Sequence, residues 1–172
     1  RNLPWKFSPI FTILKRDMKI FFAEPKPNVQ YLKLCNTQHH LIHAYERNPH
    51  RIIAAIIKEH GEKFLQGTDL IIDCGAFSLF KAKQNDKDVK EIDINEYIEK
   101  CLKVEEEYEG FFNTIHYISL DVIPFPSKTY EKVQETVQTG YNNFFTMRKQ
   151  LPPEKVIPVL HGHEDLDYLP KY

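Results

Sequence analysis

The segment Asp69–Ser78, with the sequence DLIIDCGAFS, decides the fold of this chain. Its first half, Asp69–Asp73, is a short apolar run between two aspartates, and such a run predicts a buried strand. The second half begins with Cys74, Gly75 and Ala76, which are small enough to let the backbone approach a ligand closely. The segment therefore predicts a strand that ends at a candidate binding site.

Three further runs predict strands, at Met18–Ala23, Ile115–Asp121 and Val156–His161. Apolar residues at helical spacing predict the helices between them: a broken pattern from Val29 to Tyr45 that continues over His50–His60, then Asp93–Tyr108 and Tyr130–Leu151. Strands that alternate with helices in this way predict about four parallel βα units with right-handed crossovers.

Two architectures can hold such units, an open flavodoxin-like sheet and a (β/α)8 barrel. The chain has 172 residues and stops as a helix begins near Glu164–Leu169, whereas a barrel needs about 250 residues. We therefore expect an α/β fold that is the N-terminal half of a TIM barrel. Residues 18–172 form this partial domain, truncated at the C-terminus. Residues 1–17 are proline-containing and mildly basic, and we expect a poorly packed extension, either a linker or targeting segment or sequence foreign to the native fold.

Charge and composition limit the function classes. The 23 basic and 24 acidic residues give a net charge of −1, which argues against a dedicated basic nucleic-acid module but leaves a local basic patch open. No apolar run is long enough for a membrane span. Three widely spaced cysteines form neither a disulfide framework nor a metal knuckle, so we expect a cytoplasmic protein with no membrane contact.

Polar residues close the predicted strands, at Asp73, Asp121 and His161. The carboxyl ends of parallel strands meet at one edge, where binding and catalytic residues lie. Two carboxylates in a partly dry cleft can serve as acid and base, because repulsion and desolvation separate their pKa values. They can also accept hydrogen bonds from the N–H groups of a ligand. Alternatively, each aspartate caps the following helix.

The residues next to Asp73 favour a ligand. Gly75 can adopt a φ that other residues avoid, and Phe77 offers a face that can stack on a flat heterocycle, although an ordinary core phenylalanine fits the spacing equally well. Cys74 can act as a nucleophile only beside a base and away from apolar packing.

The histidines suggest a second chemistry. His161 and His163 form an HxH pair that, with Asp73 and Asp121, can complete the site of a metal-dependent barrel hydrolase. In an extended strand, however, the two histidines point to opposite sides unless Gly162 bends the chain. The remaining histidines are predicted to be surface or helix-face residues, among them His39, His40, His43 and His116.

Three segments resemble the tRNA-guanine transglycosylases, in the right order. Ile71–Ser78 (IIDCGAFS) resembles their D-S-G-G-F/Y-Q segment. Ser119–Phe144 is similar to their FDECTPYPAT segment and the helix after it, and Pro158–His163 (PVLHGH) stands where they have V-Q-G-G. The nearest variants are those of the phage and bacterial branch that inserts deazaguanines into DNA.

The resemblance implies a TIM barrel with pentosyltransferase activity, which exchanges guanine for a free 7-deazaguanine base in tRNA or DNA. In the family an aspartate attacks the ribose C1′ and guanine leaves. By position, Asp73 contacts the base and assists proton transfer, and Asp121 binds the N–H edge of the heterocycle. Phe77 matches the stacking aromatic, and Gly75 and Gly162 belong to the base pocket.

The sequence also departs from the family. His161 stands in place of glutamine in the base site, Cys74 in place of serine and Ser78 in place of glutamine. The family's nucleophile and structural zinc site belong to later parts of the barrel. We therefore expect an incomplete fragment that binds no cofactor and does not turn over alone.

Three hypotheses follow: the base-binding part of a transglycosylase, the metal-dependent hydrolase, and a non-catalytic half-barrel that binds a base or nucleic acid. A homo-oligomer or a partner subunit would complete a half-barrel. The choice between tRNA and DNA stays open.

Overall fold

The computed structural model describes residues 22–23, 39–44, 48–85, 89–123 and 129–159, and it has an α/β fold. The strands are β1 (Phe22–Ala23), β2 (His39–His43), β3 (Asp69–Asp73), β4 (Thr114–Ile118) and β5 (Val156–Ile157). The helices are α2 (Pro49–His60), α3 (Ala76–Gln84), α4 (Ile94–Tyr108) and α5 (Tyr130–Gln150), with short 3-10 helices η2 (Glu62–Phe64) and η3 (Pro153–Lys155). Among these helices, none has the length and apolar character needed to cross a membrane.

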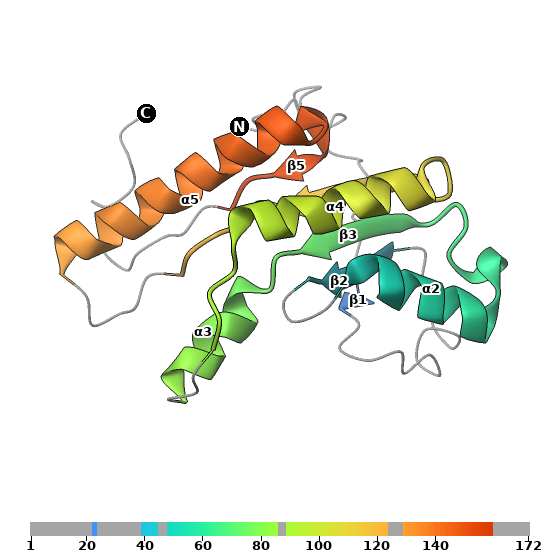
Figure 1. Cartoon of the computed structure of the whole chain (residues 1–172), viewed down its shortest axis with the longest axis horizontal. Helices are drawn as coiled ribbons and strands as arrows, with labels where there is room; N and C mark the ends of the chain where they lie inside the picture. Colours follow the sequence, from blue (N-terminus) through green and yellow to red (C-terminus); the bar gives the residue numbers. More distant parts are fainter. Residues whose placement is uncertain (1–21, 24–38, 45–47, 86–88, 124–128, 160–172) are drawn as a thin grey trace, which may run out of the picture.

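The strands form one parallel sheet in the order β1-β2-β3-β4-β5. Helix α2 packs against α4, and α4 packs against α5, so these helices lie in a row along one face of the sheet (Figure 1). Doubly wound open sheets reverse their strand order and carry helices on both faces. The sequential order and the helix row are compatible with part of a barrel, and the predicted parallel βα arrangement is confirmed.

The core lies between the sheet and this row of helices. Side chains alternate along the strands, so that Ile42, Ile72 and Tyr117 face the helices and are buried while their neighbours are half-buried. Register places these three residues side by side across β2, β3 and β4. From the helices, buried side chains meet them: Ile53, Ile56, Ile98, Cys101, Val104 and Met147.

Local signals set the helix boundaries much as the sequence predicts. Helix α2 ends at Gly61, whose φ of 82° is left-handed and whose N–H donates to the Ile57 carbonyl. Helix α4 begins at Asp93, whose carboxylate accepts hydrogen bonds from the next helix turn. Helix α5 ends at Gln150, before Pro152, because a proline cannot continue the helix.

The predictions of four strands and of a helical segment from Val29 to Tyr45 are wrong at residues 39–43. His39–His43 is a strand, so the described sheet has five strands. Its apolar residues at 41 and 42 fit a helical spacing in the sequence, but the structure buries alternate residues, with His40 fully buried against the ring of Phe64, 5.9 Å away. The predicted helix-face histidines therefore lie on strands, and His116 lies on β4.

Two elements near the predicted site also differ. The helix α3 follows β3 after two intervening residues, where the sequence predicts no helix. Strand β4 ends at Ile118, so Asp121 lies in the loop beyond the strand and does not close it. Of the other predicted segments, residues 1–17 and most of Met18–Ala23 lie outside the described residues.

Candidate functional site

The carboxyl end of β3 places Asp73 at the edge of the sheet. Asp73 is half-buried, and the backbone N–H groups of Gly75 and Cys74 favour the charged form of its carboxylate. Gly75 has a φ of 81° and is buried, which confirms the prediction that this position uses a conformation other residues avoid. The left-handed turn at Gly75 allows α3 to start immediately after the strand.

The loop after β4 brings a second carboxylate to the same place. The buried thiol of Cys74 donates a hydrogen bond to Oδ1 of Asp121, with an Sγ–Oδ1 distance of 3.4 Å. The loop segment before Asp121 is fixed by Asn143 of α5, whose amide donates to the Leu120 carbonyl at 3.0 Å. The structure therefore brings Asp73, Cys74 and Asp121 together, as convergence of parallel strand ends requires.

The two carboxyl groups influence each other electrostatically. Burial raises the pKa of Asp73, and the negative charge of Asp121 raises it further. The Gly75 N–H and the positive charge of His43, at the end of β2, oppose this rise without cancelling it. Asp73 thus keeps its proton to a higher pH than an ordinary aspartate, which suits a group that donates a proton.

The cysteine at this site is a hydrogen-bond donor and not a nucleophile. Burial, together with the charge of Asp121, raises the pKa of Cys74 to about 12. A thiol with such a pKa is almost entirely protonated at neutral pH, and only the thiolate is a good nucleophile. The structure therefore does not support a role for Cys74 as a nucleophile.

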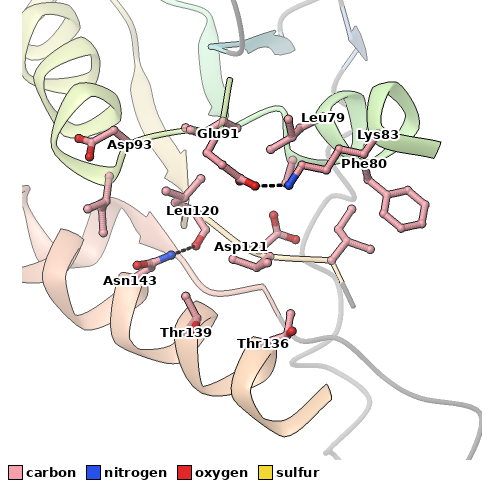
Figure 2. A pocket seen from close by; sticks show the side chains of 15 residues that line it. Leu79, Phe80, Lys83, Glu91, Asp93, Leu120, Asp121, Thr136, Thr139 and Asn143 are labelled. Atoms are coloured by element: carbon pink, nitrogen blue, oxygen red, sulfur yellow. Dashed lines mark hydrogen bonds and ion pairs between the residues drawn. The ribbon is translucent and has the colours of Figure 1, made fainter. Parts of the chain in front are cut away.

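A cavity of about 460 Å³ opens beside Asp121, within the range of roughly 300–1,000 Å³ that small-molecule sites occupy. Figure 2 shows the Asp121 carboxylate between the ion pair of Lys83 with Glu91 and the threonines of α5. Its lining comes from α3, from the segment before α4, from the loop after β4 and from α5: Ala76, Leu79, Phe80, Lys83, Glu91, Ile92, Asp93, Ile94, Leu120, Asp121, Val122, Ile123, Thr136, Thr139 and Asn143.

The sequence reasoning missed most of this lining. Thr136, Thr139 and Asn143 recur at helical spacing on α5, but this helix is rich in polar residues, so the spacing alone does not identify them. Lys83 of α3 forms an ion pair with Glu91, which precedes α4, and nothing in their spacing predicts that pairing. The pairing depends on the position of α3 relative to the segment before α4, which is a tertiary property.

Phe77 does not line the cavity. Its side chain is 59% exposed, whereas Phe80, on the next turn of α3, is half-buried and does line the cavity. The two rings lie nearly parallel, with centroids 6.5 Å apart and an interplanar angle of 16°. The Nζ atom of Lys81 lies 4.6 Å from the centroid of the Phe77 ring.

The remaining predicted site residues, His161, Gly162 and His163, lie outside the described residues. In the ranges that the structure does describe, no three His, Cys, Asp or Glu side chains are arranged to hold a metal ion. The chain matches no protein-family model, no curated protein and no solved structure.

Proposed function

We propose that this chain is the base-binding part of a guanine transglycosylase, built on part of a (β/α)8 barrel, that exchanges guanine for a 7-deazaguanine in tRNA or DNA. The observation that carries the proposal is the pair of carboxyl groups from consecutive strand ends, Asp73 and Asp121, with Asp121 inside a cavity of ligand size. The segments 71–78 and 119–144, which resemble the family, both contribute described residues to that cavity.

The cavity has the groups that guanine recognition needs. Guanine presents N–H donors on one edge and the O6 and N7 acceptors on the other. The Asp121 carboxylate can accept from the donor edge, and the Lys83 ammonium can donate to an acceptor. Apolar side chains such as Leu79 and Ile123 supply walls for the flat ring.

Asp73 has the properties of the proton donor in the exchange. In the family's exchange, an aspartate from a later part of the barrel bonds to ribose C1′ while the bond from C1′ to guanine N9 breaks. The electron pair of that bond stays on the base, and protonation of the base makes it a better leaving group. A carboxyl group with a raised pKa supplies that proton, and the resulting carboxylate takes a proton back from the incoming base. Asp121 lines the cavity and can accept hydrogen bonds from the base, so the two aspartates have separate roles.

The strand order supports the barrel. Consecutive parallel strands lie next to each other, and the connecting helices share one face (Figure 1). In a (β/α)8 barrel this order continues until the sheet closes, and the binding loops follow the carboxyl ends of the strands. The site formed by Asp73 and Asp121 follows two of those ends.

Base binding by the full chain tests the proposal. Isothermal titration calorimetry should show binding of guanine and 7-deazaguanine and at least tenfold weaker binding of adenine, which lacks the N1–H and N2 amino donors of guanine. Asp121→Asn should weaken guanine binding at least tenfold, because a hydrogen bond to a charged group contributes roughly 1.5–3 kcal/mol.

The matched control is Asp69→Asn, an aspartate at the opposite end of β3 from Asp73, which should leave guanine affinity unchanged. Equal affinity for guanine and adenine, or equal guanine affinity of the Asp121→Asn variant and the native chain, would contradict the proposal.

A further inference from the structure

Helix α3 stands apart from the other helices. It begins at the carboxyl end of β3 and extends away from the row formed by α2, α4 and α5 (Figure 1). Only its first residue, Ala76, is buried. Phe77 has the largest exposed fraction, 59%, among the exposed large apolar side chains of the described residues. The core does not account for an aromatic ring at this position.

An aromatic surface connects this ring to the cavity. Phe80 lines the cavity and also lies nearly parallel to Phe77, with ring centroids 6.5 Å apart. The apolar surface therefore runs without a break from the cavity wall to the exposed face of α3. Successive bases of a single strand stack on exposed aromatic rings, and Phe77 presents such a ring next to a cavity of the size of a base.

The charge of α3 indicates an anionic partner. The segment 76–85 contains two lysines, Lys81 and Lys83, and no acidic residue. Lys83 pairs with Glu91 inside the cavity. Lys81 lies over the Phe77 ring, 4.6 Å from its centroid, where it occupies the face that a stacking base would take.

We propose that Phe77 and Lys81 form a contact surface for single-stranded nucleic acid, and that they hold the nucleotide next to the target nucleotide. Its base stacks on Phe77 and displaces the Lys81 ammonium, which then contacts a phosphate of the same strand. The inference rests on the proposed function, since the target base enters the adjacent cavity, and it assigns Phe77 to a neighbouring nucleotide and not to the exchanged base.

A second aromatic group gives a matched control. Tyr141 and Phe145 on α5 are 45% and 40% exposed, their ring centroids lie 4.7 Å apart, and Arg148 lies beside the group, over Phe144. At 3.6 residues per turn, Tyr141 and Phe145 lie on the side of α5 opposite the cavity-lining Thr139. This group has the same chemistry but no continuity with the cavity.

Fluorescence anisotropy tests the surface on the full chain. The probes are labelled oligothymidylate and oligouridylate strands that each carry one guanine, so that the two arms compare DNA with RNA. Phe77→Ala should weaken binding of at least one strand about 5- to 150-fold, as loss of one stacked base does. Phe77→Tyr should retain binding. Lys81→Gln should weaken it and reduce the slope of log affinity against log salt by about one. Phe145→Ala should bind as the native chain does.

Two outcomes would overturn the inference: a native chain that binds neither strand, or equal affinities for Phe77→Ala and Phe145→Ala. Calorimetry with free guanine separates this failure from that of the proposed function, because Phe77→Ala should leave free guanine affinity unchanged. If oligonucleotide binding depends on Phe77 but guanine does not bind, the surface stands and the proposed function fails. If guanine binds through Asp121 but Phe77→Ala has no effect on the strands, only the surface fails.

Discussion

At the scale of single residues, Asp73 is held where its charge is unfavourable. Its folded pKa lies above the value of 3.8 for a free side chain, because of burial and the nearby Asp121. Between the unfolded and folded pKa values the folded state binds more protons, so this group lowers the free energy of unfolding as pH rises through that window. The destabilisation is complete above the folded pKa and absent below the unfolded one.

Asp73→Asn should therefore increase the free energy of unfolding at pH 7. The expected gain is about 0.5–1 kcal/mol, since partial exposure screens the repulsion, and it should vanish near pH 3. Urea denaturation across that pH range measures it. The control is Asp93→Asn, which replaces one good N-cap with another at an exposed position. A constant difference between Asp73→Asn and the native chain at every pH would refute the linkage.

Cys74 gives a prediction about reactivity. A rise in pKa from 9.0 to about 12 lowers the thiolate fraction at pH 8 by about three orders of magnitude. Alkylation of Cys74 by iodoacetamide should therefore be roughly a thousandfold slower in the native chain than in the urea-unfolded chain. Mass spectrometry of the peptide that contains Cys74 measures both rates separately from the other cysteines. Equal rates would show that the thiol is neither buried nor held by Asp121.

At the scale of elements, Tyr97 of α4 joins the two strands that carry the site. Its buried hydroxyl lies 3.2 Å from the Ile72 carbonyl of β3 and 2.9 Å from the Ile118 carbonyl of β4. A phenol has one proton, so the two carbonyls share it. The contact holds β3 and β4 together next to Asp73 at the end of β3 and just before the loop that carries Asp121.

Tyr97→Phe should lower the free energy of unfolding by about 1–2 kcal/mol, because it leaves buried carbonyls without this donor. Tyr108→Phe is the matched control: its hydroxyl donates to the His50 carbonyl at 3.2 Å from the far end of the same helix, and it is only half-buried. Urea denaturation should show a loss below about 0.5 kcal/mol for the control. Similar losses for both variants would mean that the Tyr97 hydroxyl has no special role.

The same elements show what the sequence can predict. Helices α4 and α5 are long and amphipathic and have clear end signals at Asp93 and Pro152, so pattern alone locates them. The sequence does not predict strand β2, because three of its five residues are histidines and apolar and polar residues do not alternate in it. The alternation appears only in the burial of the side chains. Convergence of Asp73 and Asp121 follows from parallel topology. The parallel topology does not predict the residues of α3 and α5 that line the cavity, because their positions depend on how separate helices pack.

At the scale of the whole molecule, the two ends of the sheet differ in what their carboxylates do. At the carboxyl end, Asp121 lies close enough to Asp73 for its charge to raise the pKa of Asp73. At the opposite end, Asp69 is buried and accepts hydrogen bonds from Asn113 Nδ2 and Thr114 Oγ1, both at 2.8 Å, and its other oxygen lies 3.0 Å from Nδ1 of His39. This second arrangement joins β2, β3 and β4 and stabilises the sheet.

Substitutions at the two ends should therefore separate stability from binding. Asp69→Ala should lower the free energy of unfolding by about 2–4 kcal/mol, since it leaves buried donors unpaired. It should still be stabilised by about 1.4 kcal/mol when guanine is present at ten times its Kd. Asp121→Ala should lose less than about 1 kcal/mol but should gain nothing from guanine. Urea denaturation of both variants with and without guanine decides the matter. If guanine stabilises both variants equally, the base does not bind at the Asp121 end. If Asp121→Ala lowers the free energy of unfolding as much as Asp69→Ala does, both ends of the sheet contribute equally to its stability.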